Sequence, residues 1–84
     1  MKVDIYYGKV SENGCGDIDI LLVKNFDIEK NNLDQFIESK KEEMLKGWSN
    51  VQKGDHIEVF VFFENGDAYA YCFDLLKGGN YETI

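Results

Sequence analysis

Two runs rich in β-branched and aromatic residues flank the dipeptide Asn65-Gly66, and this feature constrains the fold more than any other. Residues 56–63 (HIEVFVFF) precede the dipeptide and residues 68–75 (AYAYCFDL) follow it. Asn-Gly in this setting is typical of a two-residue type I′ turn, because both central positions need a positive φ that these residues tolerate. The sequence therefore predicts an antiparallel hairpin.

A two-residue loop also predicts the register of this hairpin. Directly opposite side chains lie on the same face of the sheet, and successive residues of a strand alternate between faces. The expected facing pairs are Glu64 with Asp67, Phe63 with Ala68, Phe62 with Tyr69, Val61 with Ala70, Phe60 with Tyr71, Val59 with Cys72 and Glu58 with Phe73. The face that carries the small residues is expected to receive a helix and form the core.

Three further elements are predicted upstream of the hairpin. Alternating apolar residues indicate a strand near residues 3–7 and a second one over residues 17–24, joined by the turn cluster SENGCG at residues 11–16. Apolar residues at helical spacing follow, with Asn32 as N-cap and Gly47 as C′ residue. This spacing predicts a helix of about 14 residues.

These elements define an α+β fold of the order ββαββ, in which a four-stranded, mostly antiparallel sheet has one helix packed on one face. The strand order stays open: 1-2-3-4, 2-1-4-3 and split orders are all compatible with the pattern. With 84 residues the chain is expected to form a single small globular domain over residues 1–84, with a partly frayed tail at about 77–84.

The charge balance excludes direct nucleic-acid binding. Sixteen Asp and Glu stand against nine Lys, arginine is absent, and the formal net charge is −7. Phosphate contacts are made chiefly by Arg and Lys, so a domain this acidic would repel a nucleic-acid backbone. The chain also has no apolar stretch that could span a membrane. Asp4 interrupts what would be a signal peptide, and we expect a cytoplasmic protein with reduced thiols.

The open face of the predicted sheet is the first candidate binding surface. The hairpin register places five aromatic residues on this face, and the first two strands would add Tyr6 and an acidic border. A patch this apolar is typical of a protein interface. The candidate residues are Phe60, Phe62, Tyr69, Tyr71, Phe73, Tyr6, Asp4, Asp17 and Asp19. We expect this aromatic face to be covered by a different protein, by a second copy in a symmetric dimer, or by Trp48 and the tail folded back over it.

Three carboxylates on the predicted helix form a second candidate surface. Asp34, Glu38 and Glu42 follow one another at steps of four, which places them in one line along the helix. Such a line could imitate the phosphates of a DNA strand and bind a basic channel in another protein. Lys41 and Lys46 lie three and four residues beyond Glu38 and Glu42, so an ordinary solvated face is the stronger interpretation.

Catalytic and metal-binding arrangements find little support. Cys15, His56 and Asp55 supply the residue types of a thiol enzyme, but no signature surrounds them. A zinc site would need Cys15, Cys72 and His56 with a carboxylate, yet no metal-ligand spacing occurs and Cys72 points into the predicted core. Asp17 and Asp19 could chelate a cation with Asp4, although exposed strand carboxylates are more often only solubilising. We expect no enzyme, no cofactor and no metal.

The sequence therefore favours a small acidic, non-enzymatic protein that binds and inhibits or sequesters a protein target. In size, charge and lack of arginine, but in no motif, it is similar to the acidic inhibitors that phages and plasmids make against host nucleic-acid-handling enzymes, such as anti-CRISPR proteins and uracil-glycosylase inhibitors. Two alternatives remain open: an immunity protein that neutralises a toxin, and a housekeeping homodimer whose aromatic sheet face is the dimer interface.

Overall fold

Four strands and one helix make up the computed structural model, which describes residues 1–75. The strands are β1 (Lys2–Val10), β2 (Ile20–Asp27), β3 (His56–Phe63) and β4 (Ala68–Asp74), and the helix α1 (Leu33–Leu45) lies between β2 and β3 in the chain. The predicted α+β fold of the order ββαββ is confirmed. The expected tail at about 77–84 lies outside the described residues.

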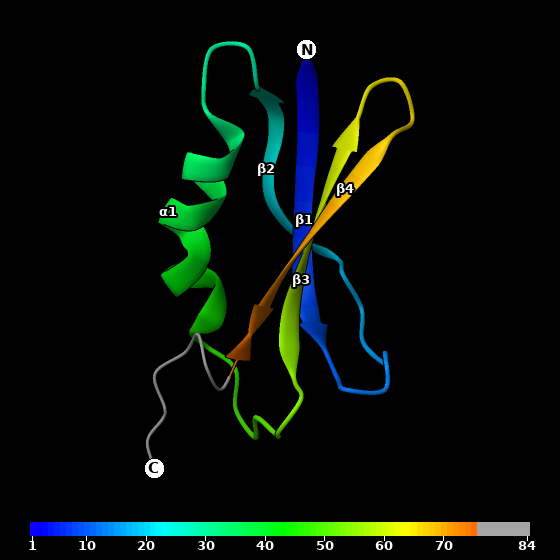
Figure 1. Ribbon diagram of the computed structural model, residues 1–84, viewed down its shortest axis with the longest axis vertical. Helices are drawn as coiled ribbons and strands as arrows, with labels where there is room; N and C mark the ends of the chain where they lie inside the picture. Colours follow the sequence, from blue (N-terminus) through cyan, green and yellow to red (C-terminus); the bar gives the residue numbers. More distant parts are fainter. Residues whose placement is uncertain (76–84) are drawn as a thin grey trace.

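The sheet has the strand order β2-β1-β3-β4, and every pair of neighbours is antiparallel. The central strand β1 therefore separates β2 from β3, which run in the same direction, and α1 belongs to the connection between them. Figure 1 shows α1 along one side of the sheet. We call the side that α1 covers the helix face and the opposite side the open face. Within residues 1–75 no helix is long and apolar enough to cross a membrane.

Strand β2 begins three residues later than predicted. The connection after β1 forms local backbone hydrogen bonds, from Ser11 N to Cys15 O (2.8 Å) and from Gly14 N to Ser11 O (2.9 Å). After an isolated bridge between Val10 and Gly16, the pairing of β2 with β1 begins at Ile20, and its register shifts twice along the strand. The prediction that Asp17 and Asp19 lie on this strand is wrong, because both precede it.

The helix is close to its predicted length and has the predicted N-cap. The Asn32 side chain accepts a hydrogen bond from Gln35 N at 2.9 Å, which satisfies one of the free amides of the first turn. At the other end Gly47 has a φ of +83°, as a C′ residue requires. The Trp48 indole Nε1 donates to Met44 O at 2.7 Å, so the side chain satisfies one of the last carbonyls.

The core lies between α1 and the helix face of the sheet. Odd-numbered residues of β1 and β3 point into it, because alternate residues of a strand share a face. The buried residues of this cluster are Val3, Ile5, Ile37, Met44, Leu45, Ile57, Val59, Val61 and Leu75. The even-numbered residues of the same two strands point to the open face, which no second helix covers within residues 1–75.

Candidate functional site

The hairpin between β3 and β4 has a three-residue loop, Glu64 to Gly66, and not the predicted two-residue loop. Phe63 N donates to Asp67 O at 2.9 Å, and Gly66 N donates to Phe63 O at 3.1 Å. Gly66 has a φ of +96°, whereas Asn65 has no positive φ. This is the geometry of a type I turn followed by a G1 bulge, so the prediction of a type I′ turn is wrong.

One additional loop residue moves the register by one and turns every β4 side chain to the other face. The sequence predicted that the small residues of β4 face the aliphatic residues of β3. In the structure the aromatic residues of β4 face them instead. The observed facing pairs are Ile57 with Phe73, Glu58 with Cys72, Val59 with Tyr71, Phe60 with Ala70, Val61 with Tyr69 and Phe62 with Ala68. The placement of Tyr69, Tyr71 and Phe73 on the open face is therefore wrong.

The physical reason for this register is the burial of large rings under α1. Tyr71 and Phe73 pack against the core, where they remove more apolar surface from water than alanine or cysteine would. The Tyr71 hydroxyl donates to Asp34 Oδ1 at 2.6 Å, and Lys41 Nζ lies 5.0 Å from the centre of the Phe73 ring. Both contacts come from α1, and both require these rings on the helix face.

Three aromatic residues remain on the open face and form a continuous group, the ring cluster of Tyr6, Phe60 and Phe62. The centre of the Phe62 ring lies 6.0 Å from that of Tyr6, in an edge-to-face arrangement, and 6.0 Å from that of Phe60. Phe62 is 44% exposed, and Leu21, which is opposite Tyr6 on β2, is 49% exposed. The apolar surface on this face is thus smaller than predicted but still accessible to a partner.

Acidic residues lie beside the ring cluster in part as predicted. Asp4 is opposite Phe62 in the sheet, and its carboxylate accepts a hydrogen bond from Asn25 N at 3.0 Å. Asp17 and Asp19 are exposed in the connection before β2. The backbone of Asp17 packs directly against Gly8, two residues from Tyr6 in β1, so this connection borders the open face.

The carboxylates of α1 are engaged mainly by groups of the same chain. Asp34 accepts the hydrogen bond from Tyr71, and Glu38 lies 3.9 Å from Lys41 Nζ. Glu42 is exposed. The pairing of Glu38 with Lys41 is what an ordinary solvated helix face predicts. The alternative that this line of carboxylates imitates DNA stays a prediction.

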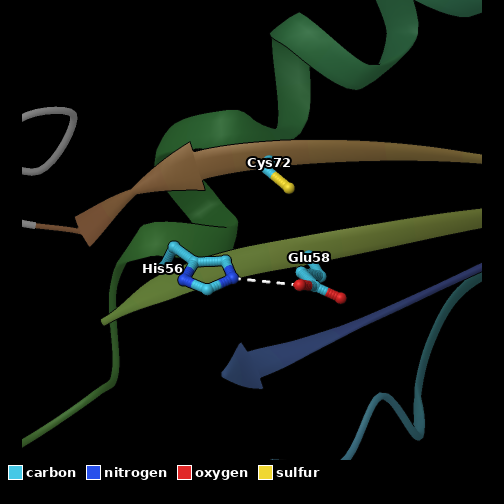
Figure 2. Close-up of side chains that lie close together, drawn as sticks. All are labelled: His56, Glu58 and Cys72. Carbon is cyan, nitrogen blue, oxygen red and sulfur yellow. Dashed lines mark hydrogen bonds and ion pairs between the residues drawn. The ribbon is translucent and has the colours of Figure 1, made fainter. Parts of the chain in front are cut away.

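A polar cluster that the sequence interpretation missed lies at the other end of the open face. Figure 2 shows His56 and Glu58 on β3 beside Cys72 on β4. His56 Nε2 lies 2.9 Å from Glu58 Oε2, and the potential ligand atoms of all three residues lie within 4.8 Å of one another. His56 and Glu58 are two residues apart, a spacing that places them on one face, but the predicted register turned Cys72 away from them.

The pKa values of this cluster reflect its contacts. The hydrogen bond to Glu58, supported by Gly54 O and the nearby charge of Asp74, raises the pKa of His56 above its ordinary value. Partial burial raises the pKa of the Cys72 thiol, and the charge of Glu58 acts in the same direction. The neighbours of His56 therefore stabilise its protonated form, and burial stabilises the thiol form of Cys72.

The other residue sets considered from the sequence do not come together as one site. Asp55 is buried. Its carboxylate accepts a hydrogen bond from Gln52 N at 2.8 Å and forms an ion pair with Lys9 Nζ at 3.5 Å, and neither contact involves the His56 ring. Cys15 lies in the connection between β1 and β2. Among the described residues, the group that could hold a metal ion contains Cys72 and not Cys15.

Comparison with known proteins adds no family: no family model, no curated protein and no solved structure matches this chain.

Proposed function

We propose that this domain is a non-enzymatic binding protein that contacts a protein partner through its open face. The observation that carries the proposal is the ring cluster of Tyr6, Phe60 and Phe62 on the face of the sheet that α1 does not cover. Large aromatic residues at the centre of an exposed patch are the usual anchors of protein interfaces.

The charge of the chain indicates which kind of partner fits this face. The formal net charge is −7, and acidic side chains border the ring cluster. A second copy would bring a charge of the same sign against this face and repel it, whereas a basic surface would be attracted and steered toward it. The proposed occupant is therefore a different protein with an apolar contact point surrounded by Lys and Arg.

A finer form of the proposal is that binding inhibits or sequesters the partner. Proteins that handle nucleic acids have basic surfaces of the required kind, and an acidic domain bound there would compete with the phosphate backbone. We place this action in the cytoplasm, in agreement with the free thiols of Cys15 and Cys72.

The test compares two glutamate variants that each replace one exposed aromatic residue. Phe62→Glu puts a charge into the ring cluster, while Tyr69→Glu changes a residue that is 60% exposed but belongs to the helix face. Each variant is first checked by circular dichroism for native folding. Wild type and both variants are then immobilised, and the proteins that each one captures are quantified at low and high salt.

The proposal requires a monomeric wild type by light scattering and at least one basic protein whose capture is lost with Phe62→Glu, kept with Tyr69→Glu and weakened by salt. The identified partner is then assayed for loss of its own activity, which tests the inhibitory form. A wild-type dimer that Phe62→Glu converts into a folded monomer would instead assign the face to self-association. Identical capture by all three proteins would also contradict the proposal.

A further inference from the structure

The polar cluster on the open face brings together three different ligand types in a chain that has only one histidine. Glu58 and Cys72 are opposite one another across β3 and β4, and His56 is two residues from Glu58 on the same face. Figure 2 shows the three side chains grouped at the ends of these adjacent strands. A nitrogen, an oxygen and a sulfur donor are thus supplied by the regular sheet.

We propose that His56, Glu58 and Cys72 bind one divalent transition-metal ion of the zinc class. Imidazole nitrogen, thiolate sulfur and carboxylate oxygen are the ligands that Zn²⁺ takes in proteins. In a tetrahedral site such ligand atoms lie about 3.3–3.8 Å apart, given metal–ligand bonds of about 2.0–2.3 Å. The three atoms lie within 4.8 Å of one another, which is close to this spacing before any ion is bound.

The His56 ring is already oriented for this role. Its Nδ1 lies 3.2 Å from Gly54 O, a carbonyl that can only accept, so Nδ1 carries a hydrogen and Nε2 faces Glu58. A backbone carbonyl that holds the second ring nitrogen is the usual way in which metal-binding histidines are positioned. Metal binding replaces the hydrogen that Nε2 shares with Glu58 and leaves the contact with Gly54 in place.

Protons are released when the metal enters. The Cys72 thiol loses its hydrogen to become the thiolate ligand, and His56 loses the Nε2 hydrogen where the ring is protonated. Glu58 contributes a carboxylate oxygen. Asp74 lies opposite His56 on the same face and adds negative charge next to the site. Affinity for the metal is therefore expected to rise with pH.

The same three residue types could also form a thiol nucleophile with its base, but their geometry favours metal binding. In a thiol enzyme the carboxylate orients one ring nitrogen and leaves the other free to take the proton of the cysteine. Here Glu58 contacts Nε2, and the other nitrogen is held by Gly54 O.

The inference does not depend on the proposed function, because the ring cluster is not part of the metal site. The probe is Co²⁺, which gives an ultraviolet charge-transfer band when a thiolate is bound, and Zn²⁺ affinity is then measured by competition with a chromophoric chelator. A phosphine reductant keeps the thiols reduced. Cys72→Ser, His56→Gln and Glu58→Gln each remove one ligand, and Cys15→Ser is the matched control for the other thiol.

We expect one metal ion per chain, a charge-transfer band in the wild type and in Cys15→Ser, and no band in Cys72→Ser. Each of the three ligand variants should bind Zn²⁺ at least about tenfold more weakly, in keeping with the usual cost of disturbing a metal site. Circular dichroism confirms that each variant is folded. Absence of saturable binding in the wild type, a band that survives Cys72→Ser, or two chains per ion would overturn the proposal.

Discussion

The Tyr71 hydroxyl donates a 2.6 Å hydrogen bond to Asp34 Oδ1 and thereby joins the edge strand β4 to the first turn of α1. Burial of the hydroxyl, together with the hydrogen bond and charge of Asp34, raises the pKa of Tyr71 to about 12. The bond exists only because the register of β4 turns Tyr71 toward the helix.

Loss of this hydrogen bond should weaken the fold measurably. Tyr71→Phe keeps the ring and removes the donor, so we expect the free energy of unfolding to fall by about 1 kcal/mol, the usual net value of a hydrogen bond. Urea denaturation measures this change, and Tyr69→Phe, on the same strand and face, is the control. A double-mutant cycle with Asp34→Asn should show that the two changes are coupled. Equal stability of the two phenylalanine variants would contradict the contact.

Folding stability should depend on pH through His56. Its pKa is raised in the folded protein, chiefly by the hydrogen bond to Glu58, so the folded state binds the proton more tightly than the unfolded state. The resulting stabilisation is fully present below the unfolded pKa of about 6.5 and is lost as the pH rises through the folded pKa.

This dependence is measured by urea denaturation from about pH 5 to about pH 9 in the absence of metal, together with an NMR titration of the single histidine. Glu58→Gln is the informative control, since it keeps the shape of the side chain and removes its charge. In this variant the pKa of His56 should move down and the fall in stability with rising pH should shrink. An unchanged titration curve of His56 would show that Glu58 does not stabilise the protonated form of the histidine.

The local elements of the fold could be predicted from the sequence because their signals are local. Asn32 accepts the hydrogen bond of an N-cap and Gly47 has the positive φ of a C′ residue, as their positions around the apolar stripe indicate. The strand order was open, since nothing local determines which neighbour β1 takes. Its pairing with both β2 and β3 is a property of the whole sheet.

The prediction of the candidate site depended on the length of the loop between β3 and β4, which Asn65-Gly66 does not determine. A glycine with positive φ suits a two-residue type I′ loop and also a three-residue loop that ends in a G1 bulge. The choice follows from burial of Tyr71 and Phe73 under α1, a tertiary effect. The same shift reduced the aromatic face to the ring cluster and placed Cys72 beside His56.

The close approach of β1 to the following connection makes Gly8 sensitive to substitution. A Cβ on Gly8 would lie 1.9 Å from the backbone oxygen of Asp17, so Gly8→Ala must push this connection away from the sheet. We expect a loss of about 1–3 kcal/mol in the free energy of unfolding and altered amide NMR shifts at Asp17 and Ile18.

Gly14→Ala separates steric contact from backbone strain in the same connection. Gly14 has a φ of +87° and no atom within 4 Å of an added Cβ, so its substitution should cost only the strain of the left-handed conformation, about 1 kcal/mol. The amide shifts of Asp17 should stay close to those of the wild type. If Gly8→Ala left both the stability and these shifts unchanged, the packing of the connection against β1 would be wrong.

The register of β4 against β3 is the central claim, because it decides which residues face α1 and which form the open face. It is tested most directly by disulfide formation with Cys72 in a Cys15→Ser background. Glu58 is opposite Cys72, so the Cα atoms of this pair lie about 4.5–5.5 Å apart, within the range that a disulfide needs. Val59→Cys is the control, since its side chain points to the helix face.

After mild oxidation, free thiols are counted by alkylation and mass spectrometry. The structure predicts that Glu58→Cys forms an intramolecular disulfide with Cys72 and that Val59→Cys keeps both thiols free. A disulfide in Val59→Cys and none in Glu58→Cys would establish the register of a two-residue loop and contradict the account of both faces.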